Sequence, residues 1–236
     1  MAFLRLNSVT RRRRQRNPDG VLQETPLFEG LNAEFRSGEV TFLTGPSGCG
    51  KSSLLRLLNR LEDPQSGVIH FRDRPLTEYP VLELRRRLVL VRQQPTPFPG
   101  SVLDNLLYVP LLLGHPRRES EARATALLGE MALPTELIHR SAGELSVGQL
   151  QRVCVARALM LEPEALLLDE PTSSLDVASA EALRAAMQRR RDENGLSAVW
   201  VTHQTTEPAA VGGPVWLLEG GLLTPVVPAA PAGDLT

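Results

Sequence analysis

A glycine-rich loop at residues 45–52 is the feature that most constrains this chain, because its flanks read as a strand and a helix. Residues 39–44 form a β-branched and aromatic run, whereas residues 53–58 place apolar side chains at helical spacing. Glycines let successive backbone N–H groups turn toward phosphate oxygens, and the N-terminus of the following helix adds partial positive charge. A G-x-x-x-x-G-K-[ST] loop in this context predicts a P-loop α/β fold with a nucleotide phosphate site. The residues expected to contact the nucleotide here are Gly45, Pro46, Ser47, Gly48, Cys49, Gly50, Lys51, Ser52 and Ser53.

Lys51 stands out in the composition, because 25 of the 26 basic residues are arginine. Its position predicts a role that a compact ammonium on a flexible stem serves better than a planar guanidinium. We expect Lys51 to reach the outer phosphates of the nucleotide and the Ser52 hydroxyl to ligate Mg²⁺.

A second phosphate-site element follows the apolar run at residues 165–168. Such a run is typical of a parallel strand that is buried on both faces, and ligands bind outside the carboxyl ends of these strands. Asp169 and Glu170 should therefore emerge beside the phosphate loop. An acidic pair at this place can also be a helix cap or a loop charge. Together with the loop, it predicts Asp169 as a Mg²⁺ ligand and Glu170 as the residue that orients or deprotonates the attacking water.

The composition excludes several classes of protein. The chain has 236 residues, of which 42% are hydrophobic and 22% charged, so it can bury a core and is not disordered over most of its length. A net charge of −1 gives no basic excess for binding nucleic acid. The longest apolar stretch, residues 106–114, is too short to span a bilayer. Two cysteines and no apolar leader favour the cytosol.

Six motifs in one order make the chain resemble the ATP-binding subunits of ABC transporters. The resemblance runs from about residue 3 to residue 219 and is more specific than any of its motifs alone. The motifs are the phosphate loop, Gln93-Gln94-Pro95, the signature at residues 145–149, Asp169-Glu170, Ser174-Leu175-Asp176 and Thr202-His203.

The resemblance assigns roles to residues outside the phosphate loop. It implies that Gln93 senses Mg²⁺ and the attacking water, and that His203 contacts the γ-phosphate. The signature, with Ser146, Gly148 and Gln149, would contact the γ-phosphate held by an opposite copy, and Asp176 would lie in the loop that crosses the interface. A signature at a helix N-terminus offers unpaired N–H donors to an anion. The implied assembly is a head-to-tail homodimer around two ATP molecules.

Two positions depart from the family pattern. Val147 stands where the family usually has the first of two glycines, and a β-branched residue stiffens this position. No aromatic residue is available to stack on the base among residues 11–16, where Arg13 takes the aligned place. The guanidinium of Arg13 can stack on a purine, or it can belong to a solvated basic hairpin tip. The preference between ATP and GTP therefore stays open.

The chain is expected to form one ABC ATPase domain over residues 1–221. Its α/β core, of the RecA-like P-loop type, would comprise residues 1–92 and 161–221, and an inserted all-helical subdomain with the signature would comprise residues 95–158. Strands at residues 3–9 and 27–35, joined by a turn near residues 17–20, would form a small antiparallel β subdomain. Residues 222–236 are rich in proline and alanine and predict a flexible tail.

The resemblance implies an ATP-hydrolysing motor subunit that drives a separate transmembrane permease from the cytoplasmic face of the cell membrane. Residues 44–51, 102–106 and 200–203 are similar to iron-export subunits, which suggests metal or iron export, while residues 97–99 are similar to phosphate-import subunits. The alternative is a soluble ABC-type ATPase that acts on a partner outside the membrane, such as a cofactor-assembly scaffold. A regulator without turnover is disfavoured, because Glu170 and His203 are both present.

Overall fold

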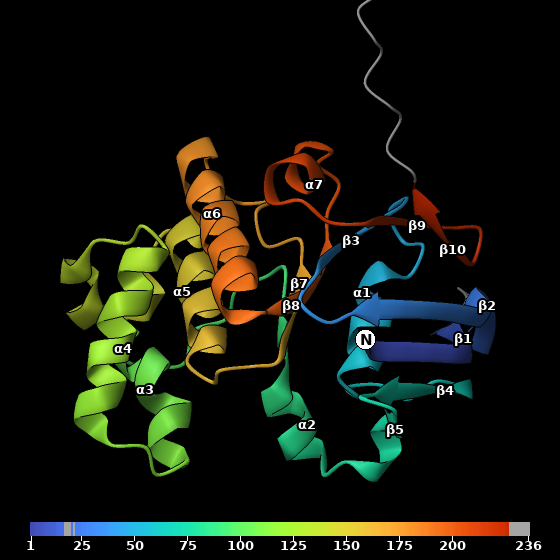
Figure 1. Cartoon of the computed structure of the whole chain (residues 1–236), viewed down its shortest axis with the longest axis horizontal. Helices are drawn as coiled ribbons and strands as arrows, with labels where there is room; N and C mark the ends of the chain where they lie inside the picture. The colour runs from blue at the N-terminus through green and yellow to red at the C-terminus, as the bar shows by residue number, and fades with distance from the viewer. Residues whose placement is uncertain (17–19, 21, 227–236) are drawn as a thin grey trace, which may run out of the picture.

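The structure is a computed structural model that describes residues 1–16, 20 and 22–226 and places them in two β-sheets with helices between and beside them (Figure 1). The smaller sheet is antiparallel, with the strand order β2-β1-β4-β5. Its strands are β1 (Ala2–Arg16), β2 (Leu22–Arg36), β4 (Ser66–Phe71) and β5 (Arg74–Pro75).

The larger sheet has the strand order β10-β9-β3-β8-β7-β6. All neighbours in it are parallel except β10 and β9, which are antiparallel. The parallel strands therefore end at one common edge, where a ligand site of this fold class forms. The strands are β3 (Val40–Thr44), β6 (Leu88–Val91), β7 (Ala165–Asp169), β8 (Ser197–Val201), β9 (Val215–Glu219) and β10 (Leu222–Val226).

Helix α1 (Lys51–Leu58) packs between the two sheets. Its leucines share one buried cluster with Leu4 and Phe28 of the small sheet and with Leu167 of β7. Because side chains alternate along a strand, Leu166 and Leu168 face the other side and join a separate cluster. This burial on both faces explains why β7 is a continuous apolar run. The packing of the α1 leucines against β7 keeps the start of α1 at the edge of the sheet.

Helices cover the second face of the larger sheet. Between residues 95 and 158 the structure has helices and no strand, apart from an isolated bridge between Ser101 and Ser141. The α/β class with an all-helical insertion is thus confirmed. These helices are α3 (Val102–Leu112), α4 (Arg117–Glu130), η2 (Thr135–His139), η3 (Ala142–Glu144) and α5 (Val147–Leu159), with α6 (Val177–Asn194) packed beside them.

Three short helices complete the described chain: η1 (Leu76–Glu78), α2 (Val81–Arg87) and α7 (Thr206–Val211). Helix α7 follows β8 and precedes β9 at the upper edge in Figure 1. In the described part of the chain, no helix has the length and apolar character that crossing a membrane requires.

The structure corrects two expectations about the ends of elements. Strands β1 and β2 are longer than expected, and residues 11–16 belong to β1 rather than to a hairpin tip. Pairs such as Arg14 with Glu24 extend the ladder beyond its apolar part, because they neutralise charge across the strands. Most of the expected turn at residues 17–20 lies outside the described residues.

The second correction concerns the expected tail. Residues 222–226 form β10, which pairs with β9. Pro225 is tolerated because β10 is the edge strand of the sheet, where a missing N–H need not interrupt a ladder. The remaining part of that tail, residues 227–236, lies outside the described residues.

Candidate functional site

The phosphate loop connects β3 to α1, and its backbone requires glycine at several positions. Gly45, Gly48 and Gly50 all have φ values in the left-handed region, at 143°, 80° and 114°. A side chain at Gly45 would clash with the carbonyl oxygen of Leu218, and one at Gly50 would come within 3.2 Å of Phe28. The loop is therefore held closely against β9 and β2, in a conformation that few other residues adopt.

Lys51 folds back onto the loop that precedes it. Its Nζ donates hydrogen bonds to the carbonyl oxygens of Gly45 at 2.7 Å and Pro46 at 2.9 Å, and the residue is only 5% exposed. The ammonium is thereby placed under the arch of the loop, where an incoming phosphate oxygen would replace the carbonyls as its acceptor.

The predicted magnesium ligands meet across the sheet edge. The Ser52 hydroxyl at the start of α1 donates to Asp169 Oδ1 at 3.0 Å. The pKa of Asp169 is raised above its ordinary value. Burial is the main cause and the nearby charge of Glu170 adds to it, while the hydrogen bond from Ser52 acts in the opposite direction. A hydroxyl and a carboxylate beside a phosphate loop form the oxygen donor set that Mg²⁺ prefers, with the rest of its shell left to water and phosphate. The donor chemistry therefore fits Mg²⁺.

Three strand ends converge on the carboxylate of Glu170. His203, after β8, lies with Nε2 at 2.7 Å from Glu170 Oε1. Gln93, after β6, donates from Nε2 to Glu170 Oε2 at 3.0 Å. Glu170 follows β7 directly and has a φ of 48°, which is uncommon for a residue with a side chain. The strand order β8-β7-β6 thus places these three side chains side by side.

One open cavity of about 440 Å³ contains these groups apart from Asp169, which does not line it. It brings together most of the residues expected to act on ATP, which come from the phosphate loop, the start of α1 and the three strand ends. Its lining residues are Arg13, Ser47, Gly48, Gly50, Lys51, Ser52, Ser53, Arg56, Gln93, Glu170 and His203.

The signature residues do not line this cavity. Ser146 caps α5 and forms a reciprocal pair of hydrogen bonds with Gln149, at 3.2 Å from Gln149 N to Ser146 Oγ and 3.1 Å from Ser146 N to Gln149 Oε1. Val147 is 59% exposed at the tip of this helix. The signature therefore presents a helix N-terminus to solvent and not to the phosphate loop of its own chain.

The loop before α6 packs against the signature. A Cβ on Gly148 would lie 3.3 Å from both Leu175 and the carbonyl oxygen of Ser174. Asp176 caps α6 by accepting a hydrogen bond from Ser179 N at 2.8 Å, and hydrogen bonds from the Ser179 backbone and side chain lower the pKa of Asp176. Asp176 thus lies with the signature, outside the cavity of its own chain.

The comparisons with known proteins identify this arrangement. The sequence matches the family model described as ABC transporter over residues 28–173, which is more than half of the chain. The chain belongs to the ABC transporter family. ATP hydrolysis by an ABC ATP-binding cassette is therefore its activity, as expected from the motif order.

Two plant proteins and a bacterial one are among the relatives of this cassette. Protein STAR1 of Oryza sativa subsp. japonica is 37% identical over 225 residues, covering 95% of this chain, and the chain spans 62% of STAR1. ABC transporter I family member 17 of Arabidopsis thaliana is 36% identical over 85% of this chain and 76% of its own length. The phosphate import ATP-binding protein PstB of Bacillus anthracis is also 36% identical, over 80% of this chain and 73% of its own length.

Solved structures of ATP-binding cassettes share the fold. A dimeric post-hydrolysis state of the cassette MJ0796, bound to ADP and phosphate, matches with a TM-score of 0.83 and 25% identity over 96% of this chain and 99% of that chain. CbiO1 from Clostridium perfringens, part of the transporter complex cbiONQ, matches with a TM-score of 0.79 and 26% identity over 94% and 87%. The P-loop fold with its helical insertion is that of an ABC cassette.

Several features of the cassette's site were not predicted from the sequence. Arg56 lines the cavity and donates to Ser53 Oγ at 3.0 Å. Its spacing of three residues from Ser53 on α1 is the signal that could have found it. Thr172, in the turn after Glu170, donates to the fully buried carboxylate of Glu207 in α7. No local pattern indicates this second pair, because the partners are 35 residues apart.

Arg13 lies next to the phosphate loop, where it donates from Nη2 to the carbonyl oxygen of Gly48 at 3.0 Å. Its place in β1, rather than in a turn, directs it to the nucleotide cavity. Whether its guanidinium stacks on the base stays a prediction.

Proposed function

We propose that this cassette is the motor subunit of an ABC transporter, in which two copies close head-to-tail around two ATP molecules and drive a separate transmembrane permease. The observation that carries the proposal is the separation of two anion-binding surfaces within one chain. The cavity holds the phosphate loop and Glu170, whereas the capped N-terminus of α5 faces solvent away from it. Each surface is completed when a second copy turns its signature toward the first copy's loop.

The dimeric state of MJ0796 supports this assembly. The exposed Val147 and Val177 add apolar surface near the two capped helix ends. In the closed state Ser146, Gly148 and Gln149 would contact the γ-phosphate bound by the other copy, and Asp176 would cross the interface. The capping box of Ser146 keeps the remaining N–H groups of the first turn of α5 available for that contact.

Hydrolysis in this proposal depends on positioning by residues of the cavity. The loop amides and Lys51 hold the phosphates, and Ser52 with Asp169 would hold Mg²⁺, which neutralises phosphate charge when bound. Glu170 accepts a hydrogen bond from Gln93 in the structure and lies 2.7 Å from His203 Nε2, and in the loaded state it orients or deprotonates the attacking water. Gln93 and His203 report the occupancy of the γ-phosphate position to the segments that follow β6 and β8.

The permease contact is proposed for the surface that follows Gln93. Phe98 and Tyr108 are exposed there, with ring centroids 4.9 Å apart, and a cavity of about 280 Å³ lies next to them. The membership of CbiO1 in the complex cbiONQ supports a membrane partner. The cassette would then act at the cytoplasmic face of the membrane, attached through its permease, with residues 1–221 working as one ATPase domain.

The permease determines the cargo. The short stretches similar to iron-export subunits favour export of a metal such as iron. The 36% identity to PstB proteins of Bacillus favours phosphate import as a second candidate.

The decisive test uses Glu170→Gln, which should retain ATP binding and trap the closed dimer. Sedimentation velocity with ATP and Mg²⁺ should show a dimer for this variant and a monomer without nucleotide. Lys51→Ala is the matched control that should stay monomeric in both conditions. A variant that binds ATP yet sediments only as a monomer would overturn the head-to-tail assembly.

The membrane partner is tested separately. The trapped variant, purified from detergent-solubilised membranes, should carry a polytopic membrane protein, identified by mass spectrometry. Recovery of a soluble scaffold in its place would favour the alternative, an ABC-type ATPase in cofactor assembly.

A further inference from the structure

A second cavity, of about 530 Å³, lies beside the nucleotide cavity and is lined mainly by arginine. Its lining includes residues 11–14 of β1 and Arg56 of α1, together with one acidic residue, Asp63. Arg13, Ser53 and Arg56 line both cavities, so the two are contiguous. The arginine cavity opens on the side of the phosphate loop away from Glu170 and His203, which line only the nucleotide cavity.

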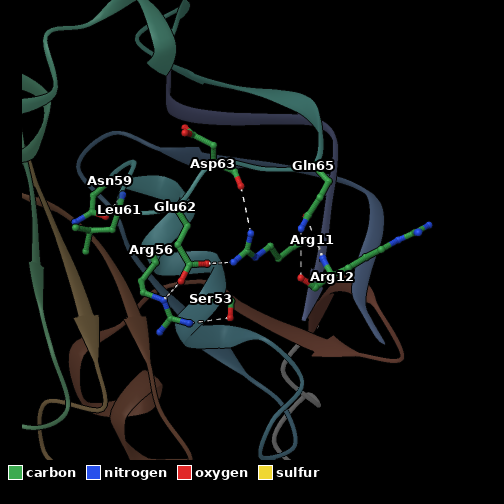
Figure 2. A network of polar contacts seen from close by, with 9 residues as sticks. All are labelled: Arg11, Arg12, Ser53, Arg56, Asn59, Leu61, Glu62, Asp63 and Gln65. Carbon is green, nitrogen blue, oxygen red and sulfur yellow. Dashed lines mark hydrogen bonds and ion pairs between the residues drawn. The ribbon is translucent and has the colours of Figure 1, made fainter. Parts of the chain in front are cut away.

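One carboxylate holds two of these arginines in place, as Figure 2 shows. Glu62 accepts from Arg56 Nε at 2.6 Å through one oxygen and from Arg11 Nη2 through the other. Arg56 also donates to Ser53, and Arg11 Nη1 donates to the main-chain oxygen of Asp63 at 3.4 Å. The guanidinium groups of β1 and α1 are thereby fixed relative to each other before any ligand binds.

The cavity keeps an excess of positive charge. Arg12 and Arg14 are paired with Glu29 and Glu24, and Asp63 on the lining pairs with Arg60. The excess comes from the other three arginines: Arg11 and Arg56 share the single charge of Glu62, and within the described residues the Arg13 side chain has a main-chain carbonyl as its partner and no ion pair. Arg11 Nε is buried and has no hydrogen-bond partner in the described part of the chain. A buried donor without an acceptor costs free energy.

Guanidinium groups fixed around a cavity match the geometry and charge of a phosphate group. The triphosphate of ATP has its own partners on the loop, Lys51 and Ser52, in the other cavity. We propose that the arginine cavity binds an additional phosphate group beside the bound nucleotide. This inference rests on the phosphate loop binding a nucleotide, but it does not depend on dimerisation or transport.

The additional phosphate has two possible sources with the same chemistry. It can be a free oxyanion such as diphosphate, or a phosphate on the ribose of the nucleotide itself. The first arm of the experiment loads the full chain with AMP-PNP and Mg²⁺ and then titrates in inorganic diphosphate by calorimetry. Saturation with AMP-PNP is measured first, so a failure of the nucleotide site is recognised as such.

Diphosphate should bind the loaded chain at one site per copy. Arg11→Gln should weaken this binding at least tenfold without displacing AMP-PNP. Arg12→Gln, at an exposed position of the same cavity, should also weaken it and serves if Arg11→Gln does not fold. Arg5→Gln is the matched control, because Arg5 also lies on β1 in a cross-strand ion pair, with Glu34, but outside the cavity. It should bind diphosphate as the wild type does.

The second arm compares ATP with ATP that carries a 3′-phosphate, in the wild type and in Arg11→Gln. If diphosphate does not bind the loaded chain, but the 3′-phosphate tightens nucleotide binding tenfold and Arg11→Gln removes that gain, the phosphate belongs to the nucleotide. The proposal is overturned if neither probe shows a phosphate-dependent gain. It is also overturned if the arginine variants bind both probes as tightly as Arg5→Gln does.

Discussion

Thr172 donates a hydrogen bond to Glu207, and both side chains are removed from solvent, at 3% and 0% exposed. The pair joins the turn after Glu170 to the helix after His203. The second carboxylate oxygen of Glu207 is buried without a partner in the described residues. Thr172→Val keeps the side-chain shape but leaves this carboxylate unpaired, which should lower the free energy of unfolding by about 1–3 kcal/mol.

Urea denaturation measures this loss. Thr125→Val is the control, because Thr125 donates to a main-chain oxygen on the exposed face of α4, and this change should stay within about 0.5 kcal/mol. Equal unfolding free energies for the two valine variants would contradict the importance of the buried pair.

The carboxylate of Glu170 should govern the chemical step. Glu170→Gln removes the group that orients or deprotonates water, so hydrolysis should slow by about 10²–10⁴-fold while ATP binding is retained. Phosphate release under single-turnover conditions measures the rate. Glu181→Gln, on the exposed face of α6, should hydrolyse ATP at the wild-type rate. A Glu170→Gln variant with normal phosphate release would remove Glu170 from the mechanism.

Two glycine-to-alanine changes should have opposite effects. Gly45→Ala places a side chain against Leu218 at a φ of 143°. The change should therefore lower the free energy of unfolding by more than about 1 kcal/mol and weaken ATP binding. Gly129→Ala, in α4 with no atom within 4 Å of the new Cβ, should add about 0.5–1 kcal/mol. Thermal unfolding of both variants provides the comparison. A stabilised Gly45→Ala protein would show that the loop is not held as described.

The capping box at the start of α3 predicts a specific pH dependence. Hydrogen bonds from the Ser101 side chain and backbone lower the pKa of Asp104 below its ordinary value of 3.8. Folding therefore favours the charged carboxylate, and this contribution is present above pH 3.8 and is lost as the pH falls through the lowered pKa. Asp104→Asn should show a smaller loss of stability between pH 5 and acid than the wild type does. Urea midpoints measured across this pH range provide the comparison. If the midpoints of the two proteins fell in parallel, the lowered pKa of Asp104 would be contradicted.

Local sequence signals predicted the elements that surround the phosphate loop. The strand before it, the helix after it and the buried strand before Asp169 follow from residues close together in sequence, and the structure has them as β3, α1 and β7. The contacts of Glu170 with Gln93 and His203 follow from the parallel order of three strands. The strand ends therefore account for the placement of these three side chains, whereas their roles toward ATP were inferred from the family resemblance and stay predictions.

The parts that sequence reasoning missed depend on partners that lie far apart in the chain. The run of arginines in β1 is typical of a solvated turn when only the local sequence is considered. The structure shows why it forms a strand, because Arg12 pairs with Glu29 and Arg14 with Glu24 across the sheet. Glu62 joins Arg11 and Arg56 from two different elements, which no local period indicates. The prolines after residue 222 likewise predict a coil, because the edge position that tolerates Pro225 is known only from the sheet order.

The placement of Lys51 allows the phosphate loop to be followed by chemical modification of one lysine. It carries the only side-chain amine in the sequence, and that amine is shielded beneath the arch of the phosphate loop by two carbonyl oxygens. An acylating reagent that modifies amines and spares guanidinium groups therefore has one side-chain amine in the sequence to modify. The rate of that reaction would follow, in real time, how often the arch opens and how firmly a bound nucleotide keeps it shut.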